Sequence, residues 1–146
     1  MKKFDTSIII QRPIEEVFAA ATEFNRLPAW RSGLIDAAIT SEGPIQSGAT
    51  YRFNIKAMGK ALETTGQIET YEPPAFYGWK ATSGPFPMSG SIRCEAVAEG
   101  TRITDTLEAE PGGFFKLAEP LLMKQQRNQM EKDLKQLKDL LEGGNS

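Results

Sequence analysis

The stretch TRITDTLEA, residues 101–109, alternates in the way that a β-strand with one buried face alternates. Ile103, Leu107 and Ala109 share one face, and most of the polar or charged residues between them take the other. Asp105 breaks this pattern because it has the parity of the apolar residues. We therefore expect a half-buried strand that directs a carboxylate toward the protein interior.

Six further segments have the composition or the alternation of strands, and turn sequences such as SEGPIQSG separate them. In one of them Ile35, Ala37 and Ile39 share a face, and in another Cys94 lies with Ile92 on the face expected to be buried. The six predicted strands are residues 7–11, 34–40, 50–57, 61–72, 76–82 and 91–97.

Two short helices are predicted after the first strand. Pro13 suits the first position of a helix in the segment 12–24, because proline needs no hydrogen-bond partner for its nitrogen there. The segment 25–33 reads as a second short helix or a tight bend that Pro28 interrupts.

The last part of the chain is predicted to be helical. Pro120 is expected to end or kink a short apolar helix over 114–120, and a long amphipathic helix should follow over 121–141, with Gly143 as a natural stop. The apolar stripe of the long helix recurs at helical spacing. Its members are Met123, Met130, Leu134, Leu137 and Leu141.

Composition limits the classes of function. The 146 residues are expected to form one domain, 1–146, and a net charge of −2 argues against nucleic acid as a partner. The single Cys94 excludes an internal disulfide and favours the cytoplasm, and no apolar run is long enough for an integral membrane segment. The absence of histidine rules out histidine-based nucleophile activation and argues against a metal site, so no metal and no cofactor are expected.

Successive antiparallel strands with helices only near the chain ends predict an α+β fold. Such a sheet must cover its apolar face, and the final helix is the only long element available to do so. A helix laid across a strongly curved sheet leaves a hollow lined by the inward strand residues and by the apolar stripe of the helix. We expect the chain to be a monomer or a weak homodimer.

Several short motifs resemble those of one superfamily. They are RPIEEVF, LPAW, YEPP before an aromatic strand with Trp79, SGPFP, GTRIT, and EPGG before the long final helix. Over roughly residues 3–142 the chain resembles the SRPBCC superfamily, within it the polyketide cyclase/dehydrase-like group, which is related to START lipid-transfer domains and to the birch-pollen allergen fold.

The resemblance implies a helix-grip fold, in which a curved seven-stranded antiparallel sheet wraps around a long C-terminal helix, with two short helices after strand 1. It also implies an apolar cavity. Members of the superfamily bind lipids, sterols, polyketides or quinones, and some catalyse cyclisation. The fold alone does not select among these activities.

Aromatic and methionine side chains are the main candidates for contacts with a ligand in that cavity. Tyr51, Tyr77 and Trp79 are predicted to line it, Trp30 to lie at its mouth, and Phe53 to pack in the core while remaining a candidate contact. Methionine adapts to irregular ligands but also fills gaps in a core that holds none. The methionine candidates are Met88, Met123 and Met130.

Asp105 is the candidate polar residue of the cavity. Since burying an unpaired carboxylate is costly, it is paired with a cation, protonated and hydrogen-bonded, or turned outward by a bulge. Arg127, at the edge of the inner helix face, is the candidate cation, and both residues are candidate ligand contacts. If the protein is an enzyme, Asp105 and Arg127 are its candidate catalytic residues.

Two functions from different classes remain open. The first is binding or transport of a small hydrophobic molecule that resembles a lipid, a polyketide or a quinone. The second is a polyketide cyclase or dehydratase that uses aspartate, tyrosine and arginine side chains in the same cavity. The missing histidine and the generic motifs favour binding. A third possibility, a domain that binds another protein on its sheet, has no sequence feature in its favour.

Overall fold

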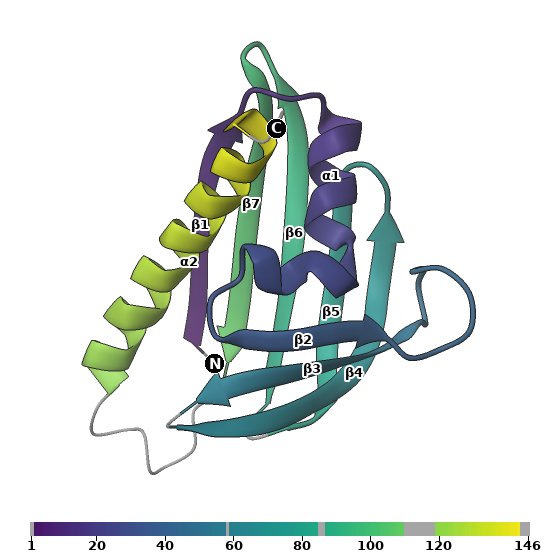
Figure 1. The fold of residues 1–146 in the computed structure, drawn as a ribbon, viewed down its shortest axis with the longest axis vertical. Coiled ribbons are helices and arrows are strands. Elements are labelled where there is room, and N and C mark those ends of the chain that lie inside the picture. The colour runs from purple at the N-terminus through teal and green to yellow at the C-terminus, as the bar shows by residue number, and fades with distance from the viewer. Residues whose placement is uncertain (1, 58, 85–86, 110–118, 144–146) are drawn as a thin grey trace.

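The structure is a computed structural model that describes residues 2–57, 59–84, 87–109 and 119–143 (Figure 1). Within these ranges, seven strands and three helices follow one another in the order predicted from the sequence. They are β1 (Lys2–Ile10), α1 (Ile14–Thr22), the 3-10 helix η1 (Phe24–Ala29), β2 (Leu34–Ile39), β3 (Thr50–Ala57), β4 (Lys60–Glu72), β5 (Phe76–Ser83), β6 (Met88–Val97), β7 (Gly100–Ala109) and α2 (Glu119–Gly143).

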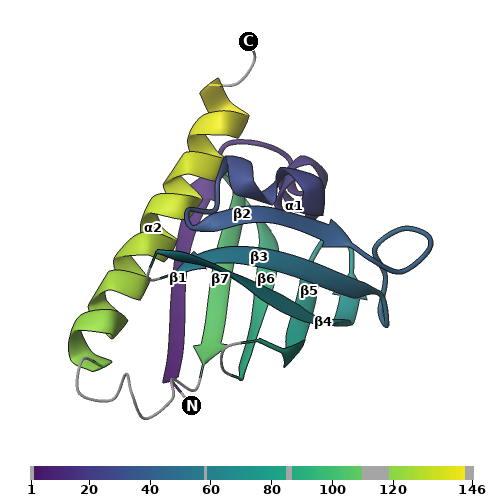
Figure 2. The same cartoon turned by 60° about the horizontal axis from the view of Figure 1, so that its bottom comes forward.

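The strands form one antiparallel sheet in the order β1-β7-β6-β5-β4-β3-β2. Six strands from β2 to β7 are neighbours in sequence order, and β1 pairs with β7 along the whole of its length. The sheet is strongly curved, so β2 and β3 run across the view in Figure 1 whereas β1, β7 and β6 run along it. Figure 2 shows the same curvature from below.

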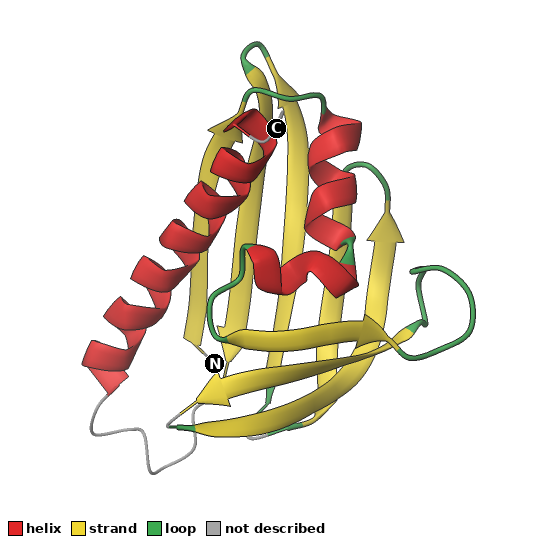
Figure 3. Ribbon diagram, viewed as in Figure 1, coloured by secondary structure: helices red, strands yellow, loops and turns green. Residues whose placement is uncertain are grey.

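All three helices lie on the concave side of the sheet (Figure 3). Helix α1 packs against β6 and β7, η1 packs against β2, and α2 packs against β1 at the edge of the sheet. This is the helix-grip fold that the resemblance implied, with two short helices after the first strand. No helix in the described part of the chain is both long enough and apolar enough to cross a membrane.

The core lies between the concave face and the helices, and the alternation along the strands decides its membership. On β7, Thr101, Ile103, Asp105 and Ala109 are buried, as the alternation of residues 101–109 predicted for the apolar face. The described part of the apolar stripe on α2 is also buried. Its members are Met130, Leu134 and Leu137, with Leu141 partly buried.

The structure corrects several expectations about the strands and helices. Strand β1 starts at Lys2 and β6 starts at Met88, because both extend their pairing with β7 to Ala109. Ile35 is 49% exposed, since the register shifts between Leu34 and Asp36 and turns Ile35 away from the core. Pro13 is the N-cap of α1 rather than its first residue.

Pro120 is the second residue of α2 instead of the end of a separate helix, and a proline is tolerated in a first turn. Most of the short helix expected over 114–120 lies outside the described residues.

The C-terminal end of α2 is fastened to the turn between β1 and α1. The Lys138 ammonium group donates a hydrogen bond to the Ile9 carbonyl oxygen at 2.7 Å, and the Gln11 amide donates one to the Glu142 carboxylate at 2.7 Å. The Arg12 guanidinium donates a hydrogen bond to the Leu141 carbonyl oxygen at 2.9 Å. The Arg12 contact satisfies a carbonyl oxygen that the helix end leaves without an internal partner.

A methyl group added at Gly66 should destabilise the protein. A Cβ atom there would collide with the Lys80 carbonyl oxygen of β5 and with the Tyr51 ring, and the backbone oxygen cannot move without breaking the sheet. We expect Gly66→Ala to lower the free energy of unfolding by about 1–3 kcal/mol in urea denaturation. Gly143→Ala is the control, because no atom lies within 4 Å of the Cβ it would add. Equal stabilities of the two variants would contradict the packing described at Gly66.

Candidate functional site

Asp105 points into the protein and is 2% exposed, as its parity on β7 predicted. Both of its carboxylate oxygens accept hydrogen bonds from Arg31, whose terminal nitrogens lie 2.8 and 3.0 Å away. Of the three possible states of Asp105, the structure therefore shows the ion pair. The predicted partner was wrong, because Arg127 is exposed on α2 and Arg31 takes its place.

The turn after η1 carries Arg31 to the sheet. The backbone amides of Trp30 and Arg31 both donate to the Leu27 carbonyl oxygen, at 3.1 and 2.8 Å, and this turns the chain sharply at the helix end. The guanidinium carbon of Arg31 then lies 4.4 Å from the centre of the Trp30 ring, within range of a cation–π contact. The turn thus presents an aromatic ring and a guanidinium group together.

Helix α2 holds the same turn from the other side. The Ser32 amide donates to Asp133 Oδ1 at 3.0 Å, and Gln136 Nε2 donates to the Ala29 carbonyl oxygen at 3.1 Å. Asp133 is buried and accepts a further hydrogen bond from Gln129. The turn between η1 and β2 is therefore fixed to β7 by Arg31 and to α2 by its backbone.

An aromatic wall covers the concave face beside this turn. Tyr51 and Phe53 of β3 lie 4.6 Å apart between ring centres, and both contact Trp79 of β5 edge to face, at 5.9 and 5.5 Å. Phe24 of η1 stacks on Phe53 at 5.6 Å and contacts Tyr77 edge to face at 6.3 Å. These are the offset and edge-on arrangements that aromatic rings prefer.

Burial keeps the hydroxyl groups of Tyr51 and Tyr77 and the thiol of Cys94 protonated at neutral pH. It raises the pKa of Tyr77 from 10.0 to about 12, although the nearby Arg31 charge partly opposes this rise. Burial also raises the pKa of Tyr51 and brings the pKa of the Cys94 thiol to about 12. For Arg31, burial lowers the pKa, but the charge and the hydrogen bonds of Asp105 outweigh it and raise the pKa above its usual value.

Most of the other side chains predicted to contact a ligand are buried in the core. Phe53 is buried in the core, as expected, and Met88 and Met130 are buried as well. Trp30 is also buried within the core cluster, where η1 packs against β2, and its place at a mouth stays a prediction. The side chain of Met123 lies outside the described residues. Contact of any of these side chains with a ligand stays a prediction.

Sequence reasoning missed several polar side chains of this interior. Arg31 could have been found as the cation next to the aromatic anchor Trp30, whereas no local pattern marks Asp133 or Thr64. Among the described residues, Trp30 Nε1, Tyr51 Oη and Thr64 Oγ1, together with Arg52 Nε on the other face of β3, are buried without a hydrogen-bond partner. No group of three or more histidine, cysteine, aspartate or glutamate side chains in the described ranges could hold a metal ion.

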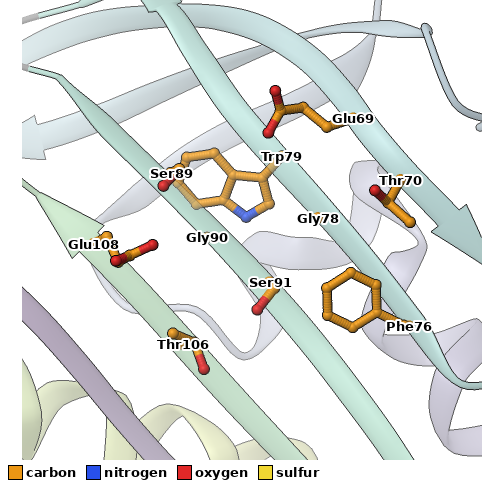
Figure 4. A pocket seen from close by; sticks show the side chains of 10 residues that line it. All are labelled: Glu69, Thr70, Phe76, Gly78, Trp79, Ser89, Gly90, Ser91, Thr106 and Glu108. Carbon is orange, nitrogen blue, oxygen red and sulfur yellow. The ribbon is translucent and has the colours of Figure 1, made fainter.

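A groove of about 230 Å³ opens on the opposite, convex face of the sheet (Figure 4). Most of the residues that line it alternate along the strands with Tyr77, Ile92 and Asp105, which face the helices, whereas Trp79 and Gly90 have the same parity as that concave set. It is lined mainly by polar side chains and glycines. They are Glu69, Thr70, Phe76, Gly78, Trp79, Ser89, Gly90, Ser91, Thr106 and Glu108.

Comparison with known proteins agrees with this architecture. The chain is a helix-grip protein with an aromatic concave wall, and it belongs to the family described as polyketide cyclase / dehydrase and lipid transport, which matches residues 1–142. A search of curated proteins found no significant match.

Solved structures share the fold at low sequence identity. TTHA0849 from Thermus thermophilus is similar at 21% identity, with a TM-score of 0.83 over 99% of this chain and 100% of that one. The Zhui aromatase/cyclase from a Streptomyces species has 13% identity and a TM-score of 0.75, over 99% and 98% of the two chains. A START superfamily protein from Mycobacterium smegmatis has 14% identity and a TM-score of 0.69, over 97% and 94%.

Replacing only one side chain of the Arg31–Asp105 pair should lower the free energy of unfolding more than replacing both. Asp105→Leu leaves a largely buried guanidinium without its partner, and we expect it to lower the free energy of unfolding by about 2 kcal/mol. The double variant Arg31→Met, Asp105→Leu should have a free energy of unfolding within about 1 kcal/mol of the wild-type value in the same urea denaturation. Additive losses in the double variant would show that the two side chains do not act as a pair.

Tyr77 should ionise late in an alkaline titration. The near-ultraviolet absorbance of tyrosinate should include a component with a pKa of about 12 that Tyr77→Phe removes. Because the folded-state pKa is raised, Tyr77 stabilises the fold fully below pH about 10, and that stability is lost as the pH rises toward 12. The wild type should thus lose more unfolding free energy than Tyr77→Phe across this range. Identical pH profiles of the two proteins would refute the assignment.

Proposed function

We propose that this protein binds and carries a small hydrophobic molecule, of the lipid, polyketide or quinone type, between the concave face of its sheet and helices η1 and α2. The observation that carries the proposal is the aromatic wall of Phe24, Tyr51, Phe53, Tyr77 and Trp79 with the Arg31 guanidinium beside it. Aromatic rings with a few polar groups among them are typical of sites that hold and orient an apolar ligand. The description of the family supports the same class of ligand.

The chemistry of the concave side favours binding over catalysis. A general acid or base works best with a pKa near the operating pH, whereas burial raises the pKa of Tyr77 to about 12 and raises that of Tyr51 as well. The Asp105 carboxylate and the Arg31 guanidinium are bound to each other through two hydrogen bonds. The two tyrosines therefore hold their protons at neutral pH, and the two charged groups are engaged with each other.

The proposal is tested by looking for a bound molecule and for saturable uptake. Native mass spectrometry of freshly purified protein should show a co-purified small molecule. The neutral probe N-phenyl-1-naphthylamine should bind with saturation and change the emission of the buried Trp79. Leu107→Trp should weaken this binding roughly tenfold, because Leu107 is half-buried on the concave face and can be enlarged there.

Ile35→Ser is the matched control. Ile35 is the most exposed large apolar side chain in the described ranges, and its removal should leave the affinity unchanged if the probe binds inside. Equal effects of Ile35→Ser and Leu107→Trp, or no saturable binding, would overturn the proposal. Turnover of a reactive polyketide by the wild type would instead identify an enzyme of the cyclase or dehydratase type.

A further inference from the structure

Three buried polar groups on the concave side lack hydrogen-bond partners among the described residues. They are the Trp30 indole nitrogen, the Tyr51 hydroxyl and the Thr64 hydroxyl, in side chains that are 0–2% exposed. Leaving such a group unpaired in the interior costs roughly 1–3 kcal/mol, so folded proteins almost always provide a partner. Three such groups on one side of the sheet indicate that a bound molecule supplies their partners.

The chemistry of these groups restricts what that molecule can present. An indole N–H can only donate, so the partner of Trp30 must be an acceptor. The Tyr51 phenol keeps its proton at neutral pH, because burial raises its pKa, and it too can donate to an acceptor. Oxygen atoms of carbonyl, ether or hydroxyl groups satisfy both requirements.

The charges nearby argue against an anionic acceptor. The cation closest to Trp30 is Arg31, which lies over its ring, and Asp105 already binds that guanidinium through two hydrogen bonds. A ligand carboxylate would have to displace Asp105 or remain next to its negative charge in a largely buried place. The site therefore penalises a second anion, and a neutral oxygen avoids that penalty.

We infer that the protein selects apolar ligands with a neutral oxygen acceptor, such as a ketone, over both unsubstituted hydrocarbons and carboxylates. This inference rests on the proposed binding function and specifies its ligand class. Tyr51 is the specificity-determining residue for the neutral acceptor, and Asp105 excludes anions by occupying Arg31.

Three naphthalenes of nearly equal shape test the inference. They are 2-ethylnaphthalene, 2-acetylnaphthalene and 2-naphthoate, compared by equilibrium dialysis at neutral pH. For the wild type, the acetyl compound should bind roughly fivefold more tightly than the ethyl compound, which is the effect of one net hydrogen bond. It should bind roughly tenfold more tightly than the carboxylate.

Two substitutions assign these preferences to their residues. Tyr51→Phe removes only the hydroxyl, so the acetyl preference should vanish while the affinity for the ethyl compound is unchanged. Tyr71→Phe is the matched control and should keep the preference, since Tyr71 is only half-buried and its hydroxyl is not among the unpartnered groups. Asp105→Asn releases the charge of Arg31 and should make naphthoate the better ligand.

The outcomes separate the two proposals. Equal binding of the ethyl and acetyl compounds, an acetyl preference that survives Tyr51→Phe, or tight binding of naphthoate by the wild type would overturn the inference on ligand class while leaving a hydrophobic binding site. Failure of all three compounds to bind would overturn the binding function, and the inference with it.

Discussion

The ion pair between Arg31 and Asp105 is the interaction on which the concave side of the protein depends. It joins the turn after η1 to the middle of β7, and the buried Asp105 needs a partner of this kind because an unpaired charge in the interior is strongly unfavourable. Trp30 and Ser32 flank Arg31, so the same pair sets where the indole lies and where α2 docks through Asp133.

The pair also sets the chemical character of the aromatic wall. Arg31 and Asp105 neutralise each other, and the tyrosines between the sheet and η1 remain uncharged because burial opposes their ionisation. The aromatic wall is therefore apolar and uncharged, but this side of the protein contains N–H and O–H groups that can donate. Such an environment suits recognition of a ligand more than proton transfer, and this distinction underlies the proposed function.

The sequence predicted the features that depend on local periodicity. Alternation found the strands and placed Asp105 inside, because side chains of a strand alternate between faces whatever the rest of the chain does. The partner of Asp105 was not predictable in this way. The helical wheel favoured Arg127 on the assumption that the edge of the apolar stripe faces the sheet, whereas α2 packs on β1 and leaves Arg127 exposed. The bulge that exposes Ile35 also has no local signal.

The pairing of β1 with β7 has a consequence for how the chain acquires its structure during synthesis. Strands β2 to β7 can pair in the order in which they leave the ribosome, but β1 waits for a partner that is made roughly 90 residues later, several seconds at ordinary translation rates. Until then the apolar side chains of Ile8–Ile10 and of the aromatic wall remain partly exposed to solvent. The nascent chain thus exposes apolar strand surface until β7 has been made.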